Sequence, residues 1–240
     1  MSTLISMKNL YKIYNPGVNE VRALDGIDLE IDEGEFVAII GHSGSGKSTL
    51  MNMIGCLDQP TEGEYHLHGQ EVAKMKDDEL AEVRNKEIGF IFQGFNLIQN
   101  LTALENVELP LIYRGVDRKT RRQLAKEALE KVGLGNRMNH LPAEMSGGQQ
   151  QRVAVARAVT AAPPLILADE PTGNLDSKST DEILGILETL YSEGRTVIII
   201  THDSEIAKRA KRVICFKDGI VEKEYDNDTK ERQNEDEKTT

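Results

Sequence analysis

A glycine-rich run between two apolar segments holds the residues best suited to chemistry. The pattern G-x-x-x-x-G-K-[ST] is matched in full by Gly41, His42, Ser43, Gly44, Ser45, Gly46, Lys47 and Ser48. Its glycines allow backbone conformations that turn successive N–H groups toward a phosphate, and the N-terminus of a following helix favours an anion. In this pattern Lys47 reaches the terminal phosphates and the Ser48 hydroxyl binds Mg²⁺. Because an apolar strand precedes the run and a helix follows it, we favour a nucleotide phosphate site over a merely flexible loop.

Two carboxylates follow directly on another apolar run, Leu165–Ala168. That run predicts a buried strand, and open parallel sheets bind their ligands at the carboxyl ends of the strands. Asp169 is then placed to hold Mg²⁺, directly or through water, and Glu170 to polarise the water that attacks the γ-phosphate. Alone, the pair is equally compatible with acids that cap the next helix, so this interpretation depends on the phosphate loop.

A second helix start suited to an anion follows Met145. Ser146 is a good N-cap, Gly147 and Gly148 let a phosphate approach the backbone, and helical residues follow Gln149. An ordinary capped helix would have the same residues. Since one nucleotide does not need both helix starts, the pattern indicates that the second one serves a nucleotide held by another copy of the chain.

The elements that carry these residues can be predicted from hydrophobic periodicity. Before the glycine-rich run we expect antiparallel strands at Ile5–Leu10, Val21–Ala23 and Ile27–Ile31, and a strand buried on both faces at Phe36–Ile40. The helix after the run is expected at Lys47–Ile54. A strand, a phosphate loop and a helix therefore follow one another.

The middle of the chain, from about Glu79 to Leu141, predicts a mainly helical lobe. Thr102–Glu105 is a capping-box pattern. The segment Arg118–Val132 has helical spacing, and Gly133 is placed to end it. The apolar positions of that helix are Leu124, Ala128, Leu129 and Val132.

The α/β pattern then resumes. The sequence predicts a helix at Asp181–Tyr191, with Ile183, Leu184, Leu187 and Leu190 on one side, and a buried strand at Thr196–Thr201. A closing hairpin is expected from Arg212–Phe216 and Ile220–Glu224, joined at Lys217, Asp218 and Gly219. The last residues, Asp226–Thr240, are almost free of apolar side chains and predict a disordered tail.

Composition limits the classes of partner. The 240 residues are 39% hydrophobic and 29% charged, with a net charge of −11. That acidic balance argues against non-specific nucleic-acid binding, which relies on basic side chains. No apolar run reaches the roughly 18–20 residues that span a bilayer, and the N-terminus has no signal region, so we expect a cytoplasmic protein unless another chain holds it at a membrane. The only cysteines, Cys56 and Cys215, fit small buried hydrophobes rather than a metal site or disulfide.

Taken together, these motifs resemble the ATPase subunits of ABC transporters over Ile5–Glu224. The run Ser146-Gly147-Gly148-Gln149 matches the signature motif, with Met145 in place of its usual leucine. Further residues match that family's remaining motifs: Gln93 senses Mg²⁺ and the lytic water, Asp176 lies in the Gly173–Asp176 loop that crosses to a partner's site, and His202 contacts the γ-phosphate. The resemblance implies that Tyr14 stacks on adenine; core packing is the alternative for this ring, and Tyr11 is the second choice.

The resemblance implies an α/β P-loop NTPase core with a mostly parallel sheet, an antiparallel β subdomain and an inserted helical lobe at about 94–160. The domain is expected at 1–225 and the acidic tail at 226–240. It also implies ATP and Mg²⁺ as cofactors, and a head-to-tail homodimer. Each ATP would lie between the Gly41–Thr49 loop of one copy and the Ser146–Gln149 turn of the other. Hydrolysis would drive separate membrane-spanning permease subunits at the inner face of the cell membrane.

The permease would dock on the lobe around Leu97–Tyr113; simple packing within the lobe explains that segment equally well. Within the family, the chain is most similar to single-cassette exporters of the lipoprotein-release and macrolide-export type, through Gly55–Asp58, Phe95–Ile98 and Leu101–Pro110. The implied cargo is a peptide, a lipoprotein or a drug-like molecule.

Two residues depart from the family pattern, and two other functions stay open. His42 replaces a common proline, with little expected effect, and Gly94 replaces a common glutamine, which could loosen the Gln93 loop. One alternative is an ATPase with a mechanical role in a cell-envelope or cell-division complex. The other, a soluble relative that acts in DNA repair or translation, is disfavoured by the single cassette, the lack of sustained heptads and the negative charge.

Overall fold

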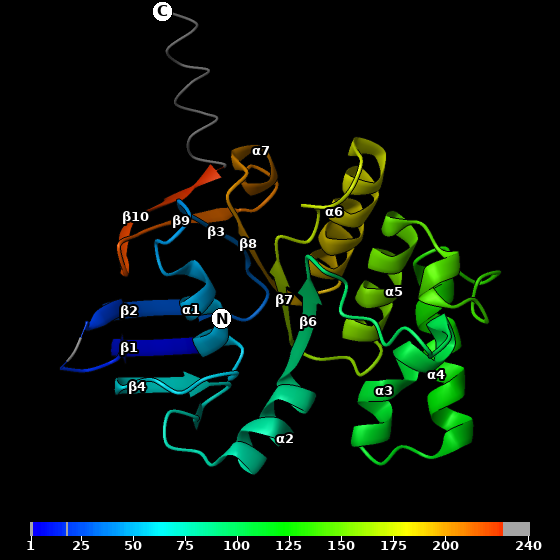
Figure 1. The fold of residues 1–240 in the computed structure, drawn as a ribbon, viewed down its shortest axis with the longest axis horizontal. Coiled ribbons are helices and arrows are strands. Elements are labelled where there is room, and N and C mark those ends of the chain that lie inside the picture. The colour runs from blue at the N-terminus through cyan, green and yellow to red at the C-terminus, as the bar shows by residue number, and fades with distance from the viewer. Residues whose placement is uncertain (1, 18, 228–240) are drawn as a thin grey trace, which may run out of the picture. The chain divides into compact units, whose positions relative to one another are not determined.

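The computed structural model describes residues 2–17 and 19–227, which form two compact units. The first unit contains the described residues up to Ala81 and from Thr196 onward, and the second is Glu82–Arg195. The boundary falls within helix α2 (Asp77–Glu87), and the colours of Figure 1 follow the chain through both units. No helix within the described residues is long and apolar enough to cross a membrane.

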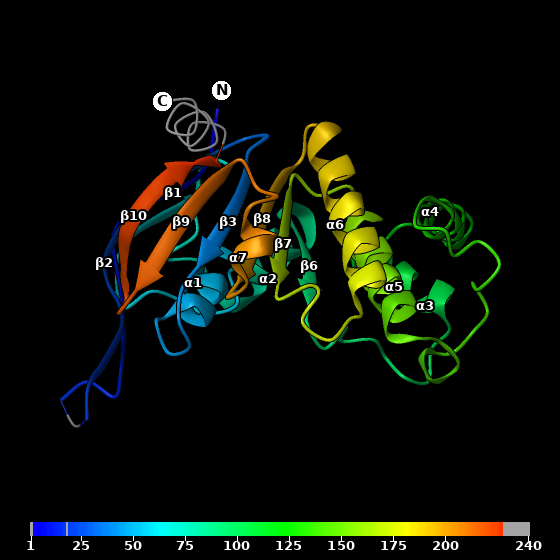
Figure 2. The same cartoon turned by 90° about the horizontal axis from the view of Figure 1, so that it is seen from above.

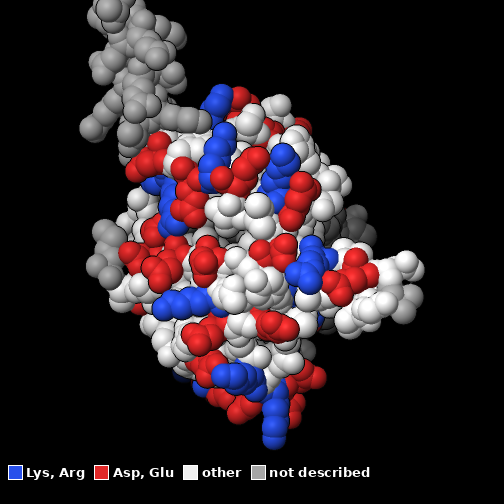
Figure 3. Space-filling model, turned by 90° about the vertical axis from the view of Figure 1, so that its left-hand side faces the viewer, with Lys and Arg blue, Asp and Glu red and all other residues white. Residues whose placement is uncertain are grey.

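An antiparallel sheet of the first unit confirms the strands expected before the glycine-rich run. Its strands have the order β2-β1-β4-β5, with bounds β1 (Thr3–Tyr14), β2 (Val21–Asp32), β4 (Glu62–Leu67) and β5 (Gln70–Glu71). The two pieces expected at Val21–Ala23 and Ile27–Ile31 are one continuous strand, β2. Alternate side chains of β2, such as Leu29 and Ile31, are buried while Asp28 and Glu30 are exposed, as in a sheet with one solvated face. Acidic and basic side chains are interspersed on the face shown in Figure 3.

The mostly parallel strands of the first unit position the phosphate loop. They have the order β10-β9-β3-β8, with bounds β3 (Phe36–Ile40), β8 (Thr196–Thr201), β9 (Arg212–Lys217) and β10 (Ile220–Asp226). Strand β3 is parallel to both β8 and β9, which flank it in Figure 2, and every residue of β8 is buried. Helix α1 (Lys47–Ile54) follows the loop as predicted, and the short helix α7 (Ser204–Ala207) follows β8.

The second unit combines a parallel strand pair with four longer helices. Strand β6 (Ile88–Phe92) pairs with β7 (Leu165–Asp169), and helix α5 (Gly147–Val159) packs against β6 and three other helices. Those helices, which surround α5 in Figure 2, are α3 (Ala103–Tyr113), α4 (Arg118–Lys131) and α6 (Ser177–Ser192). A 3-10 turn at Pro142–Glu144 precedes α5. Because α5 contacts β6 and all three of these helices, the second unit is organised around it.

Several expectations need correction in detail. The stretch expected to be mainly helical contains the unexpected strand β6, and β4, β5 and α2 were not predicted either. On α4 the buried face includes Ala125, whereas Leu124 is 36% exposed. Asp226 ends β10 instead of opening the tail, and the Asn227 side chain donates to the carbonyls of Ala207 and Ala210. The rest of the expected tail lies outside the described residues.

Other expectations are confirmed. The capping box at Thr102 and Glu105 starts α3, and Gly133 follows α4 with a φ of 74°. The four leucine and isoleucine residues predicted to line one side of α6 are buried. Asp218 and Gly219 join β9 to β10 with φ values of 47° and 81°, the conformation that tight hairpins favour. Cys56 is buried, as expected, and Cys215 is half-buried.

Candidate nucleotide site

The loop between β3 and α1 is closed by its own lysine. Lys47, the first residue of α1, donates from Nζ to the carbonyl oxygens of Gly41 at 2.6 Å and His42 at 2.8 Å. Within the loop the Ser45 N–H donates to the His42 carbonyl at 3.2 Å. The ammonium group therefore lies at the mouth of the loop, where it can exchange carbonyl oxygens for phosphate oxygens.

Close packing dictates glycine at both ends of the loop. A Cβ atom at Gly41 would lie 2.2 Å from the Phe216 carbonyl oxygen, and one at Gly46 would lie 2.4 Å from that of Ala23. Gly46 also has a φ of 99°, which other residues rarely adopt. The Gly219 N–H donates to the Ser45 carbonyl at 2.9 Å and ties the loop to the β9–β10 turn. These contacts fix the shape of the loop.

The start of α1 fits an anion. The N-cap residue is Gly46, which has no side chain that could accept a hydrogen bond from the first turn. That turn contains no acidic residue. The first N–H groups of a helix have no partner within the helix and carry partial positive charge. The buried Ser45 hydroxyl has no hydrogen-bond partner within the described residues. A phosphate group would satisfy these donors, so the residues present fit the predicted ligand.

Strand register places His202 beside this loop. Strands β3 and β8 are parallel neighbours, and Ile40 is paired with Thr201. Gly41 and His202 are the next residues of each strand, so both leave the sheet at the same edge. His202 is exposed, and Asp203 caps α7 through the Glu205 N–H at 2.8 Å.

Tyr14 lies at the surface of the first unit and is 37% exposed. Its hydroxyl donates to Asp58 at 3.2 Å, and Lys12 Nζ lies 5.2 Å from its ring centroid. Lys12 also pairs with Asp58 at 2.7 Å. Burial raises the pKa of the Asp58 carboxyl, but hydrogen bonds from Lys12 and the Gln59 N–H outweigh it, and the net pKa is lowered. The ring is therefore outside the core and fixed at its hydroxyl end.

The second unit repeats the arrangement with the other predicted residues. Phe92 of β6 is paired with Asp169 of β7, so Gln93 and Glu170 leave adjacent parallel strands at the same edge. Glu170 has a φ of 43°, which is strained for a residue with a side chain. The Gly173 N–H donates to the Glu170 carbonyl at 3.1 Å and closes this turn. Strained residues are typical of sites where a side chain must point in one direction.

The loop after Glu170 also holds Gln93. Asn174 donates from Nδ2 to the Gln93 carbonyl at 3.1 Å, and its Oδ1 lies 3.5 Å from Gln93 Nε2. A Cβ atom at Gly173 would lie 2.7 Å from the same Nε2. Further along, Asp176 caps α6 by accepting from the Ser179 N–H and hydroxyl, both at 2.9 Å, and these bonds lower the pKa of its carboxyl.

The turn at Ser146 is a complete capping box. Its hydroxyl accepts from the Gln149 N–H at 3.3 Å, and the Gln149 side chain accepts from the Ser146 N–H at 3.0 Å. Gly148 packs so closely that a Cβ atom there would lie 2.4 Å from Ser179 Oγ. A Cβ atom at Gly147 would have only ordinary contacts, with the Phe95 ring at 3.6 Å. A phosphate bound at this turn would replace the bonds between Ser146 and Gln149.

Of the predicted residues, the first unit brings together the Gly41–Thr49 loop and His202 and also carries Tyr14. The second unit carries Gln93, Ser146–Gln149, Asp169, Glu170 and Asp176. Sequence reasoning missed Gln151 and Arg157 of α5. Gln151 is fully buried and donates to the Phe92 and Pro171 carbonyls, and Arg157 donates to the Phe95 and Asn96 carbonyls. Neither residue stands out in the sequence, because the burial and the carbonyl partners are visible only in the fold.

Comparison with known proteins agrees with these motifs. The pattern of a family described as ABC transporter matches residues 24–173. The macrolide export ATP-binding/permease protein MacB of Hyphomonas neptunium is 54% identical over 218 residues, which are 91% of this chain and 34% of that protein. The uncharacterized ABC transporter ATP-binding protein YvrO of Bacillus subtilis is 55% identical over 216 residues, 90% of this chain and 94% of that one. The chain thus spans only a third of the first relative and nearly all of the second.

A solved structure is also similar to this chain. It is described as the dimeric post-hydrolysis state of the ATP-binding cassette MJ0796 bound to ADP and Pi. Its TM-score is 0.86 at 49% identity, and the match covers 93% of this chain and 98% of that one. This likeness confirms the expected α/β fold with a P-loop core, an antiparallel β subdomain and a helical lobe.

The substitutions Gly44→Ala and Gly46→Ala separate backbone strain from close packing in the loop. Both glycines have positive φ, but a Cβ atom at Gly44 meets open space. We expect Gly44→Ala to lower the free energy of unfolding by about 1 kcal/mol, the cost of a left-handed alanine. Gly46→Ala should lower it further and also abolish nucleotide binding, measured by urea unfolding and by a fluorescent ATP analogue. Equal losses in the two variants would contradict the packing argument.

Proposed function

The chain belongs to the ABC transporter family, and from that premise we propose that it is the ATP-hydrolysing subunit that drives a membrane-spanning permease. The observation that carries this proposal is the preformed loop at Gly41–Ser48, with its lysine at the mouth and an uncapped helix start behind it. The residues expected to act on the γ-phosphate lie on loops whose positions are set by strand register. The reaction converts ATP and water to ADP and phosphate.

Each residue has a role that follows from its chemistry. Lys47 and the loop N–H groups bind the β- and γ-phosphates, and His202 approaches the γ-phosphate from the neighbouring strand. Ser48, Asp169 and Gln93 offer oxygen atoms, which Mg²⁺ prefers, and bound Mg²⁺ neutralises phosphate charge. Glu170 accepts a proton from the water whose oxygen forms a bond to the γ-phosphorus as the bond to the leaving ADP oxygen breaks. Tyr14 stacks on the adenine.

The Ser146 turn acts on a nucleotide held by a second copy. The related cassette of known structure is dimeric, and a two-fold homodimer makes both sites equivalent. ATP brings the copies together because its γ-phosphate contacts the phosphate loop of one and the Ser146 turn of the other. Asp176 lies on the loop that crosses to the partner's site. Once the cleaved phosphate has left, the bridging contact is gone and the copies separate.

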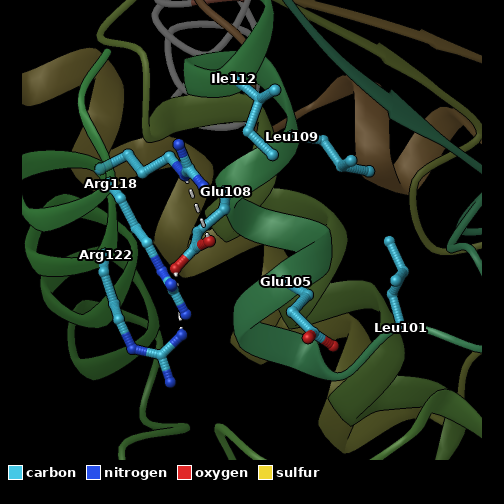
Figure 4. Close-up of a pocket in the computed structure, with 8 residues that line it drawn as sticks. Leu101, Glu105, Glu108, Leu109, Ile112, Arg118 and Arg122 are labelled. Carbon is cyan, nitrogen blue, oxygen red and sulfur yellow. Dashed lines mark hydrogen bonds and ion pairs between the residues drawn. The ribbon is translucent and has the colours of Figure 1, made fainter.

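A pocket in the helical lobe is the docking site that we assign to the permease. It has a volume of about 350 Å³ and is lined by apolar and charged residues of α3 and α4 and of the preceding loop: Leu101, Glu105, Glu108, Leu109, Ile112, Arg118, Arg121 and Arg122. Figure 4 shows Glu108 turned toward the arginines, and its carboxylate lies 3.5 Å from both Arg121 and Arg122. Arg118 makes no ion pair within the described part of the chain.

This charge pattern supports a docking segment of matching chemistry. Arg118 is left to pair with an acidic side chain of the permease, while Leu109 and Ile112 offer apolar contact. Ile112 is 45% exposed and its neighbour Tyr113 is 81% exposed, so both side chains are accessible to a partner. The occupant is therefore a short cytoplasmic segment of the permease that carries one apolar and one acidic residue.

The names of the relatives favour export. Several relatives are macrolide export proteins, so we assign a drug-like, peptide or lipoprotein cargo to the transporter. The runner-up is an ATPase with a mechanical role in a cell-envelope or cell-division complex. Both functions use the same nucleotide chemistry and differ in the protein that the lobe contacts.

The first experiment replaces Glu170 with glutamine. Glu170→Gln should bind ATP with unchanged affinity and lose hydrolysis by at least about 100-fold, because general-base catalysis contributes that much. Glu193→Gln, at the exposed end of α6, is the matched control and should leave turnover unchanged. ATP affinity is measured by fluorescence and turnover by phosphate release. Near-normal turnover in Glu170→Gln would remove Glu170 from the role of base.

Introducing a negative charge among the apolar residues of the pocket tests whether the permease docks there. Ile112→Asp should reduce co-isolation of the permease from membranes severalfold and leave the ATPase rate of the isolated chain unchanged, because the pocket is not used in hydrolysis. Ile220→Asp is the matched control, since both isoleucines are 45% exposed. If Ile112→Asp co-isolates as much permease as the control does, the pocket is not the docking site.

A further inference from the structure

The side chain of Arg157 is a half-buried cation with no acidic partner. From α5 it donates to the Phe95 carbonyl at 2.9 Å and to the Asn96 carbonyl at 2.5 Å. Burial lowers the pKa of its guanidinium, and no ion pair offsets the burial within the described residues. Arg152 on the same helix, by contrast, pairs with Glu182. Burying a charge costs free energy unless hydrogen bonds offset it, and here two backbone carbonyls provide those hydrogen bonds.

The two carbonyls belong to the strained turn after Gln93. Phe95 and Asn96 have φ values of 61° and 49°, and consecutive left-handed residues are disfavoured, above all for a bulky aromatic residue. Gly94, the residue best able to adopt this conformation, lies outside the left-handed region. The glycine therefore relieves none of the strain and contributes no side chain to anchor the loop. Arg157 provides the anchor at the strained residues themselves.

Two other buried side chains hold the ends of the same loop. Gln151 of α5 donates to the Phe92 carbonyl at 3.4 Å and to the Pro171 carbonyl at 2.5 Å. Asn106 of α3 accepts from the Ile98 N–H at 2.8 Å and donates to the Leu101 carbonyl at 3.0 Å. With both ends fixed in this way, the position of the middle depends on Arg157.

The turn links Gln93 to the Ser146 turn. The Phe95 ring lies 3.6 Å from the position of a Cβ atom at Gly147, and Leu175 of the following loop lies 3.7 Å from the same position. Gln93 itself is held by Asn174. Three loops thus meet at the first residue of α5, and the arginine that holds one of them belongs to the same helix.

We propose that Arg157 is a positioning residue for ATP hydrolysis, which fixes the strained Phe95–Asn96 turn so that Gln93 and the Ser146 turn move as one body. This inference rests on the proposed function. Only a guanidinium presents a planar fork of donors that reaches two carbonyls at once. A lysine keeps the charge and offers donors from a single point. Without the fork, Phe95 and Asn96 relax toward negative φ and Gln93 is displaced.

The test compares Arg157→Lys with Arg152→Lys, its matched control on the same helix. Arg157→Lys should lower kcat at least about tenfold, since small displacements at a reacting centre cost that much or more, and leave the KM for ATP within about twofold. We expect the KM for ATP to stay nearly unchanged because the phosphate loop belongs to the first unit, whereas Arg157 belongs to the second. Arg152→Lys keeps its ion pair with Glu182 and should retain wild-type kcat.

A second variant relieves part of the strain, at Asn96, without touching the arginine. Asn96→Gly alone should leave kcat nearly unchanged, and in the Arg157→Lys background it should restore part of the lost kcat, because glycine adopts the left-handed conformation freely. Urea unfolding of each variant shows whether the fold is intact. The inference is overturned if Arg157→Lys keeps the wild-type kcat, if only its KM changes, or if Asn96→Gly restores nothing.

A readout that needs no ATP separates this inference from the proposed function. Amide hydrogen exchange in peptides that cover residues 93–98 should rise in Arg157→Lys and stay at the wild-type rate in Arg152→Lys. Unchanged exchange in Arg157→Lys would contradict the anchoring role even in an inactive protein. If the wild type itself fails to hydrolyse ATP, the proposed function fails, whatever the exchange data show.

Discussion

The register of two parallel strand pairs is the constraint on which the remaining structure depends. Pairing of Ile40 with Thr201 brings the phosphate loop and His202 to one edge, and pairing of Phe92 with Asp169 does the same for Gln93 and Glu170. The strands resist slipping because they are almost entirely buried, and a shift of one residue would exchange the two faces of a strand. Gln93, Glu170 and His202 are each the first residue beyond a buried strand, which gives them a rigid support.

Some of the strained residues of the chain lie just beyond those strands. Glu170, Phe95 and Asn96 all have positive φ, and Gly46 is left-handed and tightly packed. Such conformations persist only where neighbouring groups hold them, and here the holding groups are the β9–β10 turn in the first unit and helix α5 in the second. Helix α5 begins at the Ser146 turn, so the part that we propose to touch a partner's nucleotide and the part that we propose to hold Gln93 in place are one element.

The sequence was sufficient to predict motifs made of neighbouring residues, but not contacts between residues that lie far apart in the chain. The phosphate loop and the capping boxes depend on residues within a few positions of each other, so spacing alone identifies them. Strand β4 was missed although Tyr65 and Leu67 are buried on either side of the less buried His66, because the segment is short and contains two glutamates. On α4 the predicted face was displaced from Ala125 to Leu124, since leucine outweighs alanine in any hydrophobic pattern. The role of Arg157 could not be predicted, because its carbonyl partners lie about 60 positions away in the chain.

The central claim is that each ATP is shared between two copies of the chain, and mixing two inactive variants tests it most directly. Lys47→Ala damages only the phosphate loop. Gly147→Asp places a carboxylate at the Ser146 turn, where a Cβ atom has only ordinary contacts, so the fold should tolerate it. In a mixed dimer one site combines the intact loop of one copy with the intact turn of the other. The account predicts that the mixture hydrolyses ATP although neither variant does alone. A mixture of folded variants that stays inactive would contradict it.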